Sequence, residues 1–175
     1  MFVPESTPPI DSNAERLRTH AFKDPLVVIA TGFGIGWIPF APGTIASLVM
    51  ALIFWFFVPV EPETRVIQFA VIFLLFIGTR LTLGFVVRKY GAKDESCIVL
   101  DEFLGMAVAL FLVPQKWWLY VIAILIFRIF DIVKPWPISW VEQRAPGAYG
   151  IILDDVIAGA GAAIITHLMG ITTHG

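Results

Sequence analysis

The chain has a single cysteine, Cys97, few charged residues and no excess of basic residues. One cysteine excludes a disulfide within the chain and a zinc site made only of cysteines. Charged residues are 15% of the 175 residues, whereas an ordinary soluble domain has about 25%. The formal net charge of −2 gives no electrostatic reason to expect nucleic acid as a partner. These shortages argue against a soluble enzyme, a disulfide scaffold and a nucleic-acid-binding protein.

Hydrophobic residues, by contrast, make up 58% of the chain, and the mean hydropathy is +0.83. Both values are typical of an integral membrane protein rather than a soluble domain. A membrane-crossing helix needs roughly 20 apolar residues, so a chain of this length has room for about five crossings. We therefore expect an all-α fold, a polytopic membrane helix bundle of about five transmembrane helices.

The polar and apolar segments divide the chain into two parts. Residues 1–24 are polar and lack the basic start and apolar middle of a signal peptide, so we interpret them as an N-terminal extension. Residues 25–175 form one membrane-embedded domain. Its first part, 26–42, is rich in glycine and proline, which predicts a broken or re-entrant segment. The spans expected after it are 44–60, 66–87, 97–113, 117–134 and 151–169.

The distribution of Lys and Arg predicts the orientation. Of the 12 such residues, five crossings would place eight on the side of the N-terminus and only Arg65 and Lys116 on the other side. Arg80 and Arg128 would lie within spans. Because basic residues are enriched in cytoplasmic loops, the N-terminus is expected in the cytoplasm.

In this topology, three groups of charged residues lie at the same, cytoplasmic face of the membrane. The third and fifth predicted spans begin there and the fourth ends there. The groups are Asp101 with Glu102, Asp131 with Lys134, and Asp154 with Asp155. Taken singly, each acid could simply flank a helix and complement its dipole. As a set they predict a site, because charge within a membrane is costly and usually functional.

The residue types in this set suit a metal ion and a phosphate. Carboxylates gathered in a poorly hydrated pocket either bind protons or take up a cation, and hard oxygen ligands suit Mg²⁺. No histidine lies near them in the sequence, which argues against a zinc or iron site. Lys134 and Arg144 would supply positive charge to a phosphate. Arg128, three residues before Asp131, forms either an ion pair within the helix or part of the same binding set.

Four segments in order resemble the phosphatidylglycerophosphatase A family. They are GFGIGWIPFAPGT (32–44), VLDEFLGM (99–106), FRIFDIVKPWPI (127–138) and GIILDDVIAG (150–159). The resemblance covers roughly residues 25–165. It implies a Mg²⁺-dependent phosphatase of the bacterial inner membrane, with its active site facing the cytoplasm. Such an enzyme removes the terminal phosphate of phosphatidylglycerol phosphate to give phosphatidylglycerol.

By this resemblance, residues of the chain receive expected roles. The metal ligands are expected to be Asp101, Glu102, Asp154 and Asp155, and the catalytic residues Asp131, Asp101 and Lys134. The substrate is expected to contact Thr44, Arg128, Lys134 and Arg144. Asp131 is the candidate general base, and an aspartyl-phosphate intermediate is an alternative route. Ala46 and Ala148 replace glycines usual in the family, which weakens any expectation of backbone contacts with phosphate there.

A small divalent-cation channel or transporter is the alternative function, since acids inside a membrane also form ion paths. An ion path would distribute acids along the membrane depth, whereas the predicted topology places them at one level. The channel would also leave Lys134 and the Pro-rich segment after it without a role. The sequence therefore favours the phosphatase.

Overall fold

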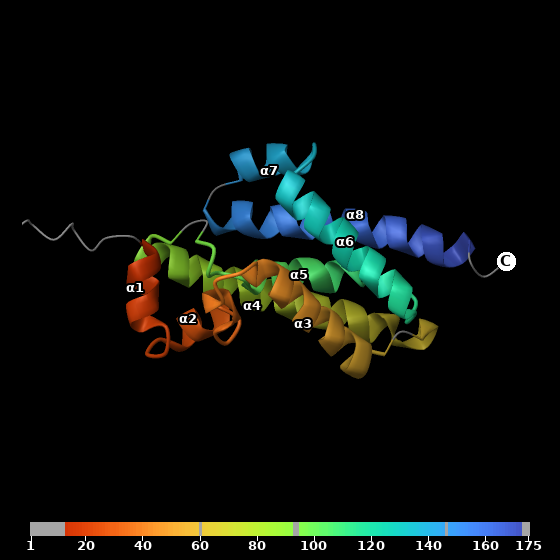
Figure 1. The fold of residues 1–175 in the computed structure, drawn as a ribbon, viewed down its shortest axis with the longest axis horizontal. Coiled ribbons are helices and arrows are strands. Elements are labelled where there is room, and N and C mark those ends of the chain that lie inside the picture. Colours follow the sequence, from red (N-terminus) through yellow and green to blue (C-terminus); the bar gives the residue numbers. More distant parts are fainter. Residues whose placement is uncertain (1–12, 60, 93–94, 146, 173–175) are drawn as a thin grey trace, which may run out of the picture.

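A computed structural model of the chain describes residues 13–59, 61–92, 95–145 and 147–172, and they contain helices and no strand (Figure 1). The expected all-α fold is confirmed for these ranges. The α-helices are α1 (Asn13–His20), α2 (Pro25–Ala30), α3 (Pro42–Phe57), α4 (Arg65–Tyr90), α5 (Leu100–Ala109), α6 (Trp117–Val133), α7 (Ile138–Arg144) and α8 (Ala148–Thr172). Two 3₁₀ turns, η1 (Ile35–Trp37) and η2 (Pro62–Thr64), precede α3 and α4.

Proline and left-handed backbone conformations set the helix ends. Pro42 occupies the first turn of α3, where a missing N–H costs nothing. Gly91 ends α4 in the left-handed region, with φ of 68°. Lys134 ends α6 with φ of 47°, and Pro135 follows it. This helix end agrees with the end of the span predicted at 117–134.

Within the described part of the chain, two helices are long and apolar enough to cross a membrane. At 1.5 Å per residue, the 26 residues of α4 and the 25 of α8 extend about 39 and 37 Å, more than the roughly 30 Å of a bilayer core. Only 28% of the most apolar part of α4 is buried within the protein. Large side chains such as Val66, Phe69 and Leu74 are exposed on α4. Such a surface is unsuited to water and suited to lipid.

The other predicted crossings are represented by shorter helices. The spans predicted at 44–60 and 117–134 correspond to α3 and α6, of 16 and 17 residues. The span predicted at 97–113 contains α5, which has only ten residues and extends about 15 Å. The chain turns after Ala109, and Leu112 adopts a positive φ of 62°. The structure supports a helix bundle with two candidate spans, and five crossings stay a prediction.

The N-terminal segment packs against the end of α4. Leu17 of α1 is fully buried, although it lies within the predicted polar extension. Asp24 accepts hydrogen bonds from the Leu26 N–H at 3.0 Å, the Lys89 ammonium at 2.7 Å and the Tyr90 hydroxyl at 2.8 Å. Residues 1–12 lie outside the described residues. The division into an extension and one membrane domain, at residue 25, stays a prediction.

The predicted broken segment at 26–42 consists of α2, a series of turns and η1. A continuous helix is excluded by positive φ values at Gly32, Phe33 and Gly34. The broken helix is therefore confirmed, whereas re-entry into a membrane stays a prediction.

Helix α5 lies at the centre of the bundle and packs against α8 and α3 (Figure 1). Glycines permit the close approach of α5 and α8: a Cβ on Gly159 would lie 2.3 Å from the Gly105 carbonyl oxygen. In Figure 1, α3, α5 and α8 run from left to right, whereas α4 and α6 run from right to left. This arrangement brings the start of α5, the end of α6 and the start of α8 together.

Candidate active site

A polar cavity of about 200 Å³ lies where α5, α6, α7 and α8 meet. The side chains lining it are Glu95, Ser96, Ile98, Asp101, Glu102, Asp131, Lys134, Glu142, Ile151, Asp154 and Asp155. All six charged residues that the sequence placed at one membrane face are among them. The convergence of three helices is therefore observed, although the chemical role of each residue is not tested by it.

Three carboxylates in this cavity form a compact group, the acidic cluster of Asp101, Glu102 and Asp155. One oxygen from each lies within 4.8 Å of the others. Asp101 and Asp155 are only 8% and 3% exposed. Asp101 Oδ1 and Glu102 Oε2 are buried without a hydrogen-bond partner among the described residues. Unpaired buried acceptors this close together repel one another and are suited to a shared cation.

The geometry of α5 and α8 explains why the acidic cluster is so tight. Asp101 and Glu102 lie in the first turn of α5, where the helix dipole favours negative charge. Gly105, one turn later, has no side chain, and a Cβ there would lie 3.0 Å from the Asp155 Cβ. Glycine at this crossing thus allows carboxylates from two helices to share one site.

The beginning of α3 also contacts the cluster. A Cβ on Gly43 would lie 2.2 Å from Glu102 Oε1 and 3.0 Å from Arg128 Nη1. Any side chain at this position would therefore displace the Glu102 carboxylate. The glycine-rich segment before α3 thus has a structural role at the site, because it lets the helix start pack directly on a carboxylate.

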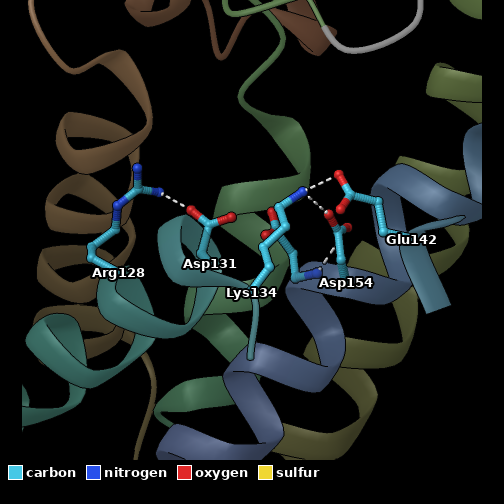
Figure 2. Close-up of polar contacts among 6 residues, drawn as sticks. Arg128, Asp131, Lys134, Glu142 and Asp154 are labelled. Atoms are coloured by element: carbon cyan, nitrogen blue, oxygen red, sulfur yellow. Dashed lines mark hydrogen bonds and ion pairs between the residues drawn. The ribbon is translucent and has the colours of Figure 1, made fainter. Parts of the chain in front are cut away.

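The cations beside the acidic cluster are engaged with other carboxylates (Figure 2). Lys134, at the end of α6, contacts Asp154 at 2.7 Å and also Glu142 of α7. Arg128 pairs with Asp131 one turn along α6, at 2.6 Å. Asp154 additionally accepts a hydrogen bond from the backbone N–H of Asp155 at 3.0 Å.

These pairings leave a specific charge imbalance. Asp131, Glu142 and Asp154 each have a cationic partner, whereas no Lys or Arg of the described chain forms an ion pair with the acidic cluster. A site for Mg²⁺ usually has one or two carboxylates, with waters completing the six oxygen ligands, and the acidic cluster can supply such carboxylates. The donor set therefore fits a Mg²⁺ ion. Asp154, expected as a fourth ligand, instead holds Lys134 in the structure.

Three residues expected to contact substrate, Thr44, Arg128 and Arg144, do not line the cavity. Thr44 follows Gly43 in the first turn of α3 and lies outside the lining. Arg144, at the end of α7, has its guanidinium over the Trp140 ring, 4.5 Å from its centroid. The remaining expected contact, Lys134, lines the cavity, and Arg128 is connected to it through its pair with Asp131.

Sequence analysis did not identify Glu142, Glu95 or Ser96 as site residues. Glu142 lines the cavity because the segment after Pro135 forms α7, which packs on the first turns of α8. Glu95 and Ser96 lie in the turn that leads into α5. In the sequence, these three residues are marked only by their position near the segments that contain the acidic residues. That position does not show which way a side chain points.

The two histidines that the structure describes, His20 and His167, do not line the polar cavity. His167 Nδ1 lies 3.0 Å from the Leu112 carbonyl oxygen, and His20 belongs to α1. No histidine is among the described residues lining the polar cavity. The described side chains that could hold a metal ion there are carboxylates.

The fold and the site indicate a class: an all-helical protein with candidate membrane spans and a buried carboxylate cluster that could hold a metal ion. The sequence profile of the phosphatidylglycerophosphatase A family matches residues 28–170. The chain is 37% identical over 148 residues to phosphatidylglycerophosphatase A of Escherichia coli, covering 84% of each protein. It is 33% identical over 158 residues to that of Haemophilus influenzae, covering 85% of this chain and 91% of the relative.

A third relative, from Bacteroides thetaiotaomicron, is 36% identical over 143 residues, covering 79% of this chain and 89% of its own length; its name provisionally assigns it as a phosphatidylinositol-3-phosphatase. No solved structure gives a significant match to the chain. The family match spans most of the molecule. The chain belongs to the phosphatidylglycerophosphatase A family, a family of phosphatases.

Proposed function

We propose that the protein hydrolyses the terminal phosphomonoester of phosphatidylglycerol phosphate, giving phosphatidylglycerol and inorganic phosphate, and that it requires Mg²⁺. The observation that carries this proposal is the acidic cluster, which forms no ion pair with a described Lys or Arg and includes two buried oxygens without a hydrogen-bond partner. The names of the relatives from E. coli and H. influenzae support the substrate.

The acidic cluster would hold the metal ion through Asp101, Glu102 and Asp155. Asp154, adjacent in sequence to Asp155, would complete the set if Lys134 released it. When bound, Mg²⁺ would offset the negative charge of the phosphate and make a water molecule a better nucleophile.

The other residues of the cavity would bind the phosphate and move protons. In the reaction, a water oxygen forms a bond to phosphorus, and the bond between phosphorus and the glycerol oxygen breaks. Asp131 would accept the proton of the attacking water, because it lines the cavity but is outside the acidic cluster. The glycerol oxygen takes up a proton and leaves as an alcohol. An aspartyl-phosphate intermediate is the competing route.

Positive side chains would stabilise the phosphate as charge redistributes. Lys134 lines the cavity and contacts two carboxylates, Asp154 and Glu142. Arg128 lies beside it and orients Asp131. We assign Thr44 and Arg144 to substrate contacts at the edge of the site. For Arg144 this role requires the guanidinium to leave the Trp140 ring.

A phosphoinositide is the second candidate substrate. The Bacteroides relative, at comparable identity, is named for the 3-phosphate of phosphatidylinositol. Both lipids carry a phosphomonoester on a headgroup that projects from the membrane, so the acidic cluster suits either. The channel alternative is not favoured, because the cavity is small, polar and located where helices begin and end, not along a path through the bundle.

Phosphate release from the two lipids distinguishes these substrates. Purified full-length protein in detergent, supplied with Mg²⁺, is expected to release phosphate from phosphatidylglycerol phosphate much faster than from phosphatidylinositol 3-phosphate. Asp101→Ala and Asp154→Ala should abolish release while the protein stays folded. The exposed Glu63→Gln serves as the carboxylate control. Full activity in both site variants would refute the assigned site, and a preference for the phosphoinositide would refute the substrate.

For the membrane, we propose a multi-pass arrangement in the bacterial inner membrane with the cavity facing the cytoplasm. The exposed apolar surfaces of α3, α4 and α6 support membrane insertion, and the distribution of Lys and Arg supports the orientation. In a variant without Cys97, single cysteines are placed at Lys93, outside the described residues, and at Lys116. The cysteine at position 93 is expected to be labelled only from the cytoplasm, and the cysteine at position 116 only from outside. Labelling of both cysteines from one side would contradict five crossings.

A further inference from the structure

A second, basic cavity of about 300 Å³ lies between the last turns of α4 and the first turn of α8. We call it the arginine pocket; the residues used to define it are Arg80, Gly84, Arg88, Gly147 and Tyr149. No carboxylate is among the described side chains that line it. It is separate from the polar cavity, with which it shares no lining residue.

Among the residues of this pocket, Arg80 is the one whose charge is least favourable in free energy at its position. It lies nearly three turns before the end of the apolar helix α4, where an unpaired cation is unfavourable in a membrane. Its guanidinium stacks on the Tyr149 ring, 4.2 Å from the centroid. Its Nε atom is buried without a hydrogen-bond partner, and no described carboxylate forms an ion pair with the side chain. Packing against the Tyr149 ring does not neutralise the positive charge of the Arg80 guanidinium. The pocket is therefore suited to binding an anion.

Gly84 and Arg88 shape the rest of the pocket. A Cβ on Gly84 would lie 2.6 Å from Arg80 Nη1, so glycine lets the guanidinium lie directly against the helix. Arg88 Nε donates to the Gly84 carbonyl oxygen at 2.9 Å, which fixes the side chain and leaves its two terminal nitrogens for a ligand. Two arginines around one glycine, with planar donor groups, match the geometry of phosphate oxygens.

The surroundings favour a lipid as the source of that phosphate. Beside the pocket, α4 presents apolar side chains outward, among them Leu81 at 67% exposed and Ile77 at 40%. Acyl chains can lie along such a surface while the headgroup enters the pocket. Basic pockets between membrane helices commonly bind anionic lipid headgroups.

We infer that the arginine pocket binds the phosphate group of an anionic glycerophospholipid, at a site distinct from the acidic cluster. Tyr149 and Asp154 are five residues apart on α8, so their side chains leave the helix in directions about 140° apart. A lipid in the arginine pocket therefore lies on the other side of this helix from the carboxylates. The inference does not depend on which phosphomonoester the acidic cluster hydrolyses.

Lipid binding to the full-length protein in non-ionic detergent tests this inference. Native mass spectrometry is used to compare phosphatidylglycerol with phosphatidylcholine of the same acyl chains, and inorganic phosphate is titrated separately. Phosphatidylglycerol is expected to bind in preference to phosphatidylcholine. Arg88→Gln should weaken its binding roughly tenfold, since it removes a charge-assisted contact. Arg65→Gln, at the opposite end of α4, is the matched control and should leave binding unchanged.

Gly84→Ala is the second variant, because Arg80 itself could be needed for folding. Alanine favours the helix but displaces the Arg80 guanidinium. It should lower the affinity for phosphatidylglycerol without lowering the thermal midpoint. Asp155→Asn should keep lipid binding, which separates this site from the acidic cluster.

Three results would overturn the inference. One is wild-type affinity for phosphatidylglycerol in both Arg88→Gln and Gly84→Ala. Another is equal binding of phosphatidylcholine. The third is phosphate binding that depends on Arg88 while phosphatidylglycerol binding does not, which would assign the pocket to a free anion.

Discussion

Asp101, Glu102 and Asp155 lie close together, and no Lys or Arg among the described residues forms an ion pair with them. Their mutual repulsion costs stability, and the cost is repaid when a cation binds between them. Sequence reasoning named all three, because acids in apolar segments are conspicuous. It could not distinguish them from Asp154, because only the folded structure shows that Asp154 pairs with Lys134.

Removing one charge from the acidic cluster tests its role directly. Asp155→Asn keeps the size of the side chain but removes a ligand, and Mn²⁺ affinity measured by electron paramagnetic resonance should fall at least about tenfold, or 1.4 kcal/mol. Without metal, the same variant should be at least as stable as the wild type, since repulsion is relieved. The exposed Glu63→Gln is the control. Unchanged Mn²⁺ affinity in Asp155→Asn would contradict the proposed ligand set.

Asp24 gives a prediction about pH. Hydrogen bonds from Lys89 and then Tyr90 lower the pKa of the Asp24 carboxyl from 3.8 to about 2. Because the pKa is lower in the folded protein, the carboxylate stabilises the fold above about pH 4, and this contribution is lost as the pH falls towards 2.

Asp24→Asn keeps the cap of α2 and removes the charge. It should lower the thermal midpoint at pH 7 by about 2 °C, a small effect because Lys89 is half exposed. The difference from wild type should be smaller at pH 3. A difference that grows on acidification would show that the assigned partners are wrong.

At the scale of helices, the apolar composition of a segment and the positions of proline predicted the length and the end of a helix where tertiary packing did not change them. The long apolar helices α4 and α8 and the stop of α6 at Lys134 follow from composition and from Pro135. The length of α5 did not follow, because residues 97–113 are apolar throughout their second half yet the chain turns at Leu110–Leu112. Apolar composition shows that a segment is buried in protein or lipid, and it does not show which.

The crossing of α5 and α8 determines whether the acidic cluster forms. Gly159→Ala would place a Cβ 2.3 Å from the backbone oxygen of Gly105, so the two helices must separate. The variant should lose about 1–3 kcal/mol of stability and bind Mn²⁺ more weakly.

Gly78→Ala in α4 is the matched control for this crossing. A Cβ there meets nothing within 4 Å, so the variant should keep both stability and Mn²⁺ affinity. Both properties are read from thermal unfolding with and without the metal. Equal behaviour of the two glycine variants would show that the crossing is not tight.

At the scale of the whole molecule, the sequence predicted an all-α membrane-type bundle in which three distant acidic segments meet. The convergence of these segments could be predicted because the expected direction of each helix follows from the number of crossings before it. Charged residues at the helix ends are then expected at the same face of the membrane. The directions of the side chains could not be predicted, so Glu142 was missed and the position of Arg144 over the Trp140 ring was not foreseen.

Dependence of catalysis on a divalent cation tests the central claim most directly. Phosphate release from phosphatidylglycerol phosphate is measured for the purified protein while Mg²⁺ is titrated from a chelated solution upwards. The structure predicts no release in excess chelator and a saturable recovery with Mg²⁺, which Asp155→Asn shifts to higher concentrations. Release at the full rate in chelator would contradict a function for the acidic cluster as a metal site.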